Sequence, residues 1–369
     1  MNPPEAAVTR HWGTTVYTSA QVLGIPLGYD REATPVGQAL PEPFDHGLRR
    51  ALERCTRVVV AFDGKLGDSL LAFGAVTAVT DALSLLGRSV PFTALGRYGR
   101  LHPARHTDDS HRGSPRIIVG DEPGAALADP TGDDHVLLCR PEHARCRDDG
   151  RRVHTFLPAR YYLEVEERFG RRLPGGPPFL PSLAPDTCDT DGQEFSVAAV
   201  TATSRPGRKD YGAQRFAAAA RIIGVRVGRK ARLLLVSGHD GAGDLPADTD
   251  GLRVEPVMGA GLETLTSLFA RCDVVLGNDT GLTHLAALAS RRAEVIGLYG
   301  RHSHSKWRTG LAHHHALATP FSERMHRWDM CPVRDGLDEA EGERYAPLSA
   351  ISPATLADTA VLVLERGYL

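Results

Sequence analysis

Short apolar runs alternate along this chain with segments in which hydrophobic residues recur every three or four positions. Short apolar runs favour buried strands, and the wider spacing favours amphipathic helices. The pattern predicts strands at residues 58–62, 117–119, 136–139, 196–200, 233–236, 274–276 and 295–299. It predicts helices at residues 69–86, 160–170, 213–223, 262–271, 282–292 and 353–365, the last with Ser352 as a candidate cap. Such alternation is typical of α/β domains built on parallel sheets.

The chain divides at a segment of different composition. Residues 173–195 are rich in proline, glycine and aspartate, which suits an interdomain linker. We therefore expect an irregular N-terminal extension (1–54), a first domain (55–175), a linker (176–195), a second domain (196–350) and a C-terminal segment (351–369). Strand–helix alternation on both sides of the linker predicts two doubly wound, Rossmann-like domains.

Composition and charge narrow the range of partners. The net charge of the 369 residues is −2, so neither nucleic acid nor an anionic membrane is the expected partner. The apolar runs are of strand length, the N-terminus lacks a signal-peptide pattern, and we expect no integral membrane contact. The six cysteines form no CxxC pair, which favours a reduced, cytoplasmic location. The sequence leaves the oligomeric state open.

The strongest local signal is the turn GNDTG at residues 277–281, between strand 274–276 and helix 282–292. Glycines on both sides let the backbone turn sharply and approach a ligand closely. Asp279 or Thr280 can cap the start of the helix with a side-chain oxygen. A helix that begins at the carboxyl end of a parallel strand favours an anion, so this turn predicts a phosphate site.

Two more polar loops follow predicted strands. Loop 63–69 (DGKLGDS) contains Asp68, which is either a general base toward a hydroxyl or a helix cap; position alone does not decide. Loop 201–211 (TATSRPGRKDY) carries hydroxyls and cations that can grip a diphosphate, although a solvated basic loop has the same composition. Neither a Walker phosphate loop nor a GxGxxG fingerprint is present, which argues against a nicotinamide dehydrogenase.

The histidines and paired aspartates do not predict a metal site. His302, His304 and the run at 313–315 lack a matching cysteine or carboxylate pattern, so we interpret them as surface or satisfied loop histidines. The DTD sequences at 189–191 and 248–250 lie in loops without a flanking strand, and neither indicates a metal–sugar motif. We expect no metal and no other cofactor.

The block DVVLGNDTGLTHLAALA at residues 273–289, followed by VIGLYG at 295–300, closely resembles the signature of glycosyltransferase family 9, the bacterial heptosyltransferases. Loop 63–69 resembles the N-terminal motif of that family. Loop 203–216, in which Lys209 is followed by an aromatic residue, resembles its phosphate loop. The resemblance covers residues 57–310, and it departs at Phe62, where the family usually has a basic residue.

The resemblance implies a GT-B fold, with a cleft between two Rossmann-like domains and a C-terminal helix that crosses back to the first. It implies inverting, metal-independent transfer of a heptose or hexose from a nucleoside diphosphate sugar, with ADP-heptose favoured. Asp68 would be the general base, and Lys209 would neutralise the departing diphosphate. The other implied residues are Thr203, Ser204, Thr280, Gly281, Leu282 and Thr283 for the diphosphate, Asp279 for the donor sugar, Ser237, Gly238, Met258 and Gly259 for the nucleoside, and Lys65 and Gly67 on the acceptor side.

The acceptor and the reaction class leave alternatives. Richness in arginine, alanine and glycine suggests a high-GC genome, and we expect a soluble acceptor from antibiotic or other secondary-metabolite biosynthesis. A GT-B-fold nucleotide-sugar epimerase or hydrolase is an alternative that would use Asp68 together with a cleft histidine. An inactive sugar-nucleotide-binding module is another, but the joint presence of Asp68, Lys209 and Asp279 argues against it.

Overall fold

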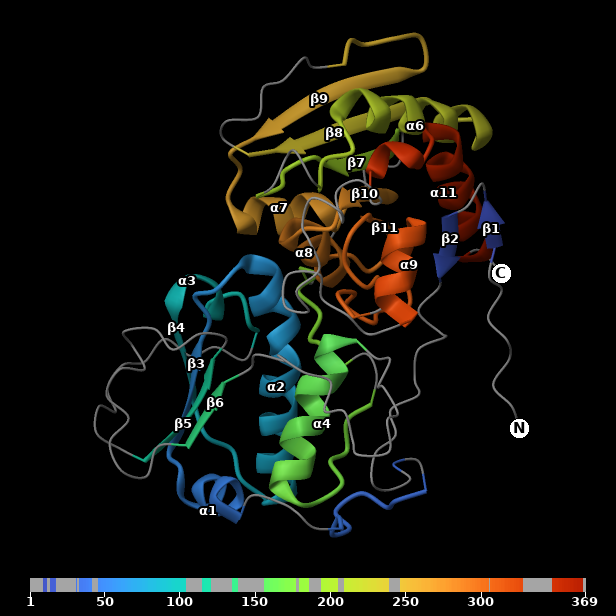
Figure 1. Cartoon of the computed structure of the whole chain (residues 1–369). Helices are drawn as coiled ribbons and strands as arrows, with labels where there is room; N and C mark the ends of the chain where they lie inside the picture. The colour runs from blue at the N-terminus through green and yellow to red at the C-terminus, as the bar shows by residue number, and fades with distance from the viewer. Residues whose placement is uncertain are drawn as a thin grey trace. The chain divides into compact units, whose positions relative to one another are not determined.

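The computed structural model describes residues 9–11, 14–17, 31, 33–41, 46–103, 115–120, 135–138, 156–176, 179–185, 194–204, 209–238, 246–304, 306–327 and 347–367. The chain forms two compact units, one of residues Gly24–Ser182 and one of Met1–Leu23 together with Leu183–Leu369. The division after Ser182 lies inside the segment expected to be a linker. Each unit consists of a sheet with helices packed on it (Figure 1).

The unit of residues 24–182 is built on a four-stranded parallel sheet in the order β4-β3-β5-β6. Its strands are β3 (Arg57–Ala61), β4 (Phe92–Leu95), β5 (Arg116–Gly120) and β6 (His135–Leu138). Its helices are α1 (His46–Arg54), α2 (Leu66–Leu85), α3 (Gly96–Gly99) and α4 (Leu157–Phe169). Strand β3 is buried along its whole length, as expected for an inner strand of a parallel sheet.

Helix α2 forms the core of this unit and lies between the sheet and α4 (Figure 1). Its residues are apolar on nearly all sides, which is typical of a helix with neighbours all round. It packs closely on α4, because a Cβ added at Gly74 would lie 2.4 Å from the carbonyl oxygen of Pro158. Among the described residues, α2 is the helix that is long and apolar enough to cross a membrane, although 67 % of its apolar 18-residue window is buried. Polar residues such as Thr77 and Asp81 interrupt the apolar sequence of α2, so the sequence shows no continuous apolar run of this length.

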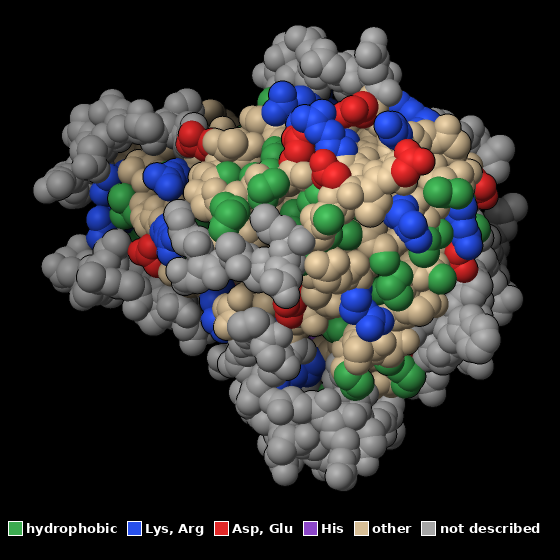
Figure 2. All heavy atoms as spheres, turned by 90° about the horizontal axis from the view of Figure 1, so that it is seen from above, with side chains coloured by type: hydrophobic (Ala, Val, Ile, Leu, Met, Phe, Trp, Pro, Cys, Tyr) green, Lys and Arg blue, Asp and Glu red, His purple; other side chains and the backbone are tan. Residues whose placement is uncertain are grey.

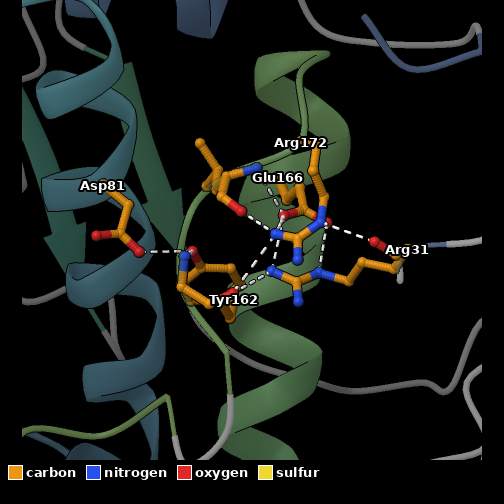
Figure 3. Close-up of polar contacts among 7 residues, drawn as sticks. Arg31, Asp81, Tyr162, Glu166 and Arg172 are labelled. Atoms are coloured by element: carbon orange, nitrogen blue, oxygen red, sulfur yellow. Dashed lines mark hydrogen bonds and ion pairs between the residues drawn. The ribbon is translucent and has the colours of Figure 1, made fainter. Parts of the chain in front are cut away.

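A buried charged cluster joins Arg31 to the chain around α4 (Figure 3). Arg31 donates from Nε and Nη2 to the two carboxylate oxygens of Glu166, at 2.9 and 3.0 Å. Arg172 donates from Nη1 to Glu166 Oε2 at 3.4 Å, and the Glu166 side chain is fully buried. We call these three residues the Glu166 cluster. Beside it, Tyr162 of α4 donates its hydroxyl to Asp81 of α2 at 2.5 Å, which ties the two helices together.

The other unit is built on an eight-stranded sheet in the order β1-β2-β12-β11-β10-β7-β8-β9. The strands are β1 (Thr9–His11), β2 (Thr14–Tyr17), β7 (Phe195–Val200), β8 (Ala231–Ser237), β9 (Leu252–Met258), β10 (Val274–Asn278), β11 (Glu294–Tyr299) and β12 (His314–Ala318). The helices are α6 (Ala213–Arg226), α7 (Leu262–Phe269), α8 (Gly281–Ala289), α9 (Pro320–Arg327) and α11 (Pro353–Gly367), with a 3-10 turn at Leu348–Ala350. Strands β7 to β12 run parallel in the Rossmann order, so the direction of winding reverses between β7 and β10.

The N-terminal segment differs from the irregular extension expected for residues 1–54. Strands β1 and β2 pair antiparallel, and β2 also pairs antiparallel with β12, with Tyr17 opposite Ala316. The segment therefore extends the edge of the eight-stranded sheet, and its later part forms α1 in the other unit. Strands of three and four residues are too short to produce an alternating pattern in the sequence.

The resemblance implies that the C-terminal helix crosses to the first domain. Within the unit of residues 1–23 and 183–369, α11 packs against α6 and β11. Leu356, Ala360 and Val363 are buried in the core of that unit. The predicted cap is confirmed, because Ser352 Oγ accepts a hydrogen bond from the Thr355 amide at 3.0 Å.

The surface seen from above the view of Figure 1 has mixed character (Figure 2). Basic and acidic side chains lie interspersed on this face, and the hydrophobic side chains form small, separate groups. The large hydrophobic residues that are exposed among the described ones are Val36, Val225 and Met258. The mixture of charges on this face agrees with the small net charge of the chain.

Candidate functional site

The two predicted phosphate loops meet at the reversal of the eight-stranded sheet. Strands β7 and β10 are paired neighbours, with Val200 opposite Gly277, and both loops leave from the carboxyl ends of these strands. In open α/β sheets, ligands bind in the crevice outside the carboxyl ends of the strands where the winding reverses. The fold therefore brings the loop with Lys209 to the turn with Asp279, although 70 residues separate them in the sequence.

Asn278 fixes these two segments against each other. Its side chain is fully buried, and Oδ1 accepts a hydrogen bond from the Tyr211 amide at 3.1 Å. Its Nδ2 donates to the Thr201 carbonyl oxygen and to Asp210 Oδ1, both at 3.3 Å. The amide of Asn278 thus holds both ends of the described part of the loop, and with them the position of Lys209.

Lys209, Asp279 and His302 meet around one carboxylate oxygen, and we call them the Lys209–Asp279–His302 cluster. Lys209 Nζ and His302 Nδ1 each lie 2.8 Å from Asp279 Oδ2, and they lie 3.1 Å from each other. Burial alone raises the pKa of Asp279, but the charge of Lys209 and the hydrogen bond from His302 outweigh it and lower that pKa well below its usual range. Burial and the neighbouring charge of Lys209 lower the pKa of His302. At neutral pH the cluster is therefore an ammonium, a carboxylate and a neutral ring.

These ionisation states fix the direction of the hydrogen bonds. Because an ionised carboxylate only accepts, the proton of the neutral His302 ring lies on Nδ1 and is donated to Asp279. Lys209 donates to the same oxygen and, at 3.2 Å, to the backbone carbonyl oxygen of Asp279. Among the described residues, neither Asp279 Oδ1 nor His302 Nε2 has a hydrogen-bond partner. One acceptor and one ring nitrogen of the cluster thus remain for a ligand.

The start of α8 lacks the side-chain cap expected from Asp279 or Thr280. Thr280 occupies the capping position, but no side-chain oxygen accepts from the first turn of the helix. Asp279 is directed to Lys209 instead, and Thr280 Oγ1 is buried without a partner among the described residues. A buried hydroxyl and an uncapped helix start both suit a bound anion.

The four predicted amides at this helix start are not equivalent. The Thr283 amide donates to the Thr280 carbonyl oxygen at 3.1 Å, and the Thr283 hydroxyl donates to the Asn278 carbonyl oxygen at 2.6 Å. Thr283 therefore serves the turn itself and has no group left for a phosphate. The amides of Gly281 and Leu282 donate to no carbonyl oxygen in the described chain, and they are the ones suited to an anion.

The residues expected at the nucleoside lie side by side at the same edge of the sheet. Ser237 and Gly238 follow β8, Met258 and Gly259 follow β9, and Ser237 pairs with Met258 in the register of the two strands. Met258 is 42 % exposed, which leaves an apolar side chain at the surface where a base can stack on it. Thr203 and Ser204 follow β7 at this edge too, whereas residues 205–208, with two arginines, lie outside the described residues.

The predicted acceptor-side residues belong to the other unit. Lys65 is the capping residue of α2 without a side-chain cap bond, and Gly67 and Asp68 lie in the first turn of the helix. Asp68 is half-buried and is not the cap that the alternative interpretation required. A carboxylate in the first turn still stabilises a helix through its dipole, so a purely structural role for Asp68 has a physical basis.

The histidines are the functional candidates that sequence reasoning missed. His304 and His314 are fully buried. The expectation of surface or satisfied loop histidines holds for His304, a loop residue whose Nε2 lies 3.3 Å from Glu323 Oε2, and it is wrong for His314 and His315, which lie on strand β12. His302 contacts Asp279, and its position just after β11 is the signal that was available, since carboxyl ends of parallel strands share one edge. Within the described ranges, no group of three or more histidine, cysteine, aspartate or glutamate side chains is arranged to hold a metal ion.

Comparisons with known proteins concern the family and the fold of the chain. Residues 182–327 match the family model of glycosyltransferase family 9 (heptosyltransferase), a segment that includes every site residue of the eight-stranded unit. No curated protein sequence shows a significant match to the chain. The family 9 glycosyl transferase of Veillonella parvula DSM 2008 has a similar structure, with 16 % identity, a TM-score of 0.58, and coverage of 89 % of this chain and 99 % of that one.

A second structure supports the same fold. The E. coli ADP-heptose lipopolysaccharide heptosyltransferase II is similar at 14 % identity and a TM-score of 0.53, over 85 % of this chain and 100 % of that one. The expected α/β fold of the GT-B type is thus confirmed, as is the resemblance to family 9. The chain has a GT-B-like α/β fold, and its residues 182–327 match the model of glycosyltransferase family 9 (heptosyltransferase).

Proposed function

We propose that this protein transfers a heptose or hexose from a nucleoside diphosphate sugar to a hydroxyl of a small-molecule acceptor, with inversion at the anomeric carbon and without a metal ion. One observation carries the proposal: an ammonium, a carboxylate and the open start of α8 meet where the winding of the Rossmann sheet reverses. The heptosyltransferase description of the matched family makes a heptose the first sugar to test, and ADP-heptose, which names the similar E. coli heptosyltransferase II, is the first donor.

The donor half of the reaction follows from the charges at this edge. When the sugar–phosphate bond breaks, negative charge develops on the leaving diphosphate, and groups that stabilise it lower the barrier. Lys209 and the amides of Gly281 and Leu282 supply positive charge there. In other transferases a divalent metal stabilises the leaving diphosphate in the same way. Asp279 Oδ1 is the acceptor for a sugar hydroxyl, and the ends of β8 and β9 hold the nucleoside.

The acceptor half of the proposal rests on Asp68. In an inverting transfer, a base removes the acceptor proton as the hydroxyl attacks the anomeric carbon from the face opposite the leaving group. The family resemblance assigns this role to Asp68, with Lys65 and Gly67 beside it in the same turn. The small, antibiotic-like acceptor is inferred from the composition of the chain alone.

Calorimetric titration with ADP, GDP, UDP, CDP and dTDP, with and without EDTA, tests the donor half. We expect one diphosphate to bind with an affinity that EDTA does not change, and that nucleotide identifies the donor base. Binding that EDTA abolishes would refute the metal-independent mechanism. Failure of all five to bind would refute the proposed function.

The variant Asp68→Asn tests the catalytic assignment. It keeps the size of the side chain, replaces one acceptor oxygen by an NH2 donor, and cannot accept a proton at neutral pH. We expect unchanged binding of the diphosphate and a loss of donor turnover of at least about 100-fold. Full turnover in this variant would exclude Asp68 as the base.

The position of His302 favours a second candidate function, because its Nε2 is available beside Asp279, the residue expected to hold the donor sugar. A nucleotide-sugar epimerase or hydrolase needs such an acid–base group near the anomeric carbon. Incubation with ADP-heptose in the absence of acceptor distinguishes the two. Rapid release of ADP and free sugar would favour the hydrolase, and conversion of ADP-heptose to an epimeric ADP-sugar would favour the epimerase.

A further inference from the structure

The contacts of Lys209 raise a problem that the proposed function has to solve. In the structure its ammonium is bonded to Asp279 through both the carboxylate and the backbone carbonyl oxygen. A lysine that stabilises a diphosphate has to turn toward the phosphate oxygens. Asp279 is only 8 % exposed, so losing Lys209 leaves a carboxylate in surroundings that disfavour an unpaired charge.

His302 is placed to solve it. Its Nδ1 lies 2.8 Å from the same oxygen, Asp279 Oδ2, that Lys209 holds. The residue is anchored independently of Lys209, because Ser322 Oγ donates to its backbone carbonyl oxygen at 2.5 Å. Its ring also lies against Trp307, with centroids 5.8 Å apart. The imidazole can therefore keep its hydrogen bond when the lysine leaves.

We propose that His302 is a positioning residue that holds the Asp279 carboxylate ionised and in place while Lys209 turns to the donor diphosphate. This inference rests on the proposed function and deepens it. The neutral ring contributes a hydrogen-bond donor and no net charge, so it does not compete with Lys209 for the phosphate. Asp279 keeps one donor throughout, and its Oδ1 stays directed at the sugar.

ADP binding to four proteins tests the inference: the wild type, His302→Ala, Asp279→Asn and the double variant. In His302→Ala, Lys209 is the remaining hydrogen-bond donor to the Asp279 carboxylate, and this bond is lost when Lys209 turns to ADP. We therefore expect His302→Ala to bind ADP about 10- to 100-fold more weakly than the wild type. The amide in Asp279→Asn carries no negative charge, so it needs no stabilising donor from His302 and forms no ion pair with Lys209. In that background, we expect removal of His302 to change ADP affinity by less than about threefold.

The conservative variant His302→Asn separates positioning from folding. The asparagine amide nitrogen occupies nearly the place of Nδ1 and donates a hydrogen bond without titrating. We expect its ADP affinity to lie within about threefold of the wild type. Thermal melting of each variant shows whether the fold is retained.

The outcomes separate the inference from the proposed function. If the wild type binds ADP and His302→Ala binds ADP with the same affinity, the proposed role of His302 is refuted, and the diphosphate site is unaffected. An equal loss in the wild-type and Asp279→Asn backgrounds would also overturn it, because a purely structural role does not depend on the carboxylate. Absence of ADP binding in the wild type, with none of the other four diphosphates bound, would overturn both.

Discussion

The Glu166 cluster gives a prediction about stability that is independent of the reaction. The carboxylate of Glu166 accepts hydrogen bonds from Arg31 and Arg172 and, at 2.9 Å, from the Leu173 amide. The substitution Glu166→Gln preserves the shape of the side chain but removes its charge. It also places an amide NH2 among donors that need acceptors, and it leaves two guanidinium groups, 15 % and 12 % exposed, without a counter-ion.

The magnitude follows from burial. Removing one partner of a buried ion pair costs about 3–5 kcal/mol, since the remaining charge stays in poor solvent. We expect Glu166→Gln to lower the free energy of unfolding of this unit by about 3 kcal/mol. The matched control is Glu53→Gln, which removes an exposed pair with Arg49 in the same unit. It should cost less than about 0.5 kcal/mol.

Hydrogen exchange measured by mass spectrometry is the suitable assay. The three tryptophans, at positions 12, 307 and 328, all lie outside residues 24–182, so their fluorescence does not report on this unit. A loss of about 3 kcal/mol accelerates the exchange of protected amides in α2 and α4 about 100-fold. Exchange in Glu166→Gln as slow as in the Glu53→Gln control would refute the reasoning, because the cluster would then contribute no more than a surface pair.

Two further predictions concern the unit that carries the site. Gly277→Ala places a Cβ 2.2 Å from Thr283 Oγ1 and should lower the urea midpoint by an amount equivalent to about 1–3 kcal/mol. Adding Thr283→Ala should recover part of that loss, and strictly additive losses would contradict the clash. Burial lowers the pKa of His284 to about 4 and of His304 to about 3. Below pH about 6.5, these two histidines therefore bind protons in the unfolded chain but not in the folded protein. The stability that depends on these neutral rings is complete above pH about 6.5 and is lost toward pH 4, by about 3 kcal/mol per ring. Urea titrations followed by tryptophan fluorescence at pH 7 and pH 4.5 measure this loss, and equal midpoints would contradict it.

The buried strands and the main helices were predictable because their residues carry the signal locally. Strand β10 and helix α8 have continuous apolar residues on either side of a glycine-flanked turn, and the structure has both at nearly the predicted bounds. Strand β9 gave no such signal, since it is an edge strand with charged residues and Pro256, which an edge tolerates. Strand β12 begins with His314 and His315, which have low strand propensity, and pairing with β11 overrides it.

The site was predictable in its loops and only partly in its contacts. The turn after β10 and the loop after β7 were recognised because glycines, hydroxyls and cations follow buried strands. The role of Asn278 in joining them was not, because its partners depend on which strands are neighbours. His302 was missed for the same reason: its contact with Asp279 spans 23 residues and arises only when β11 pairs with β10. The packing of α11 on α6 likewise follows from burial that a local pattern does not specify.

The measurement that tests the central claim most directly compares ADP binding in Lys209→Ala and Lys230→Ala by calorimetry. Both variants remove one ammonium from the same unit, but Lys209 lies in the Lys209–Asp279–His302 cluster and Lys230 is exposed before β8. We predict that Lys209→Ala weakens ADP binding at least about tenfold and that Lys230→Ala binds as the wild type does. Equal affinity in the two variants would contradict the assignment of the diphosphate to the carboxyl ends of strands β7 and β10.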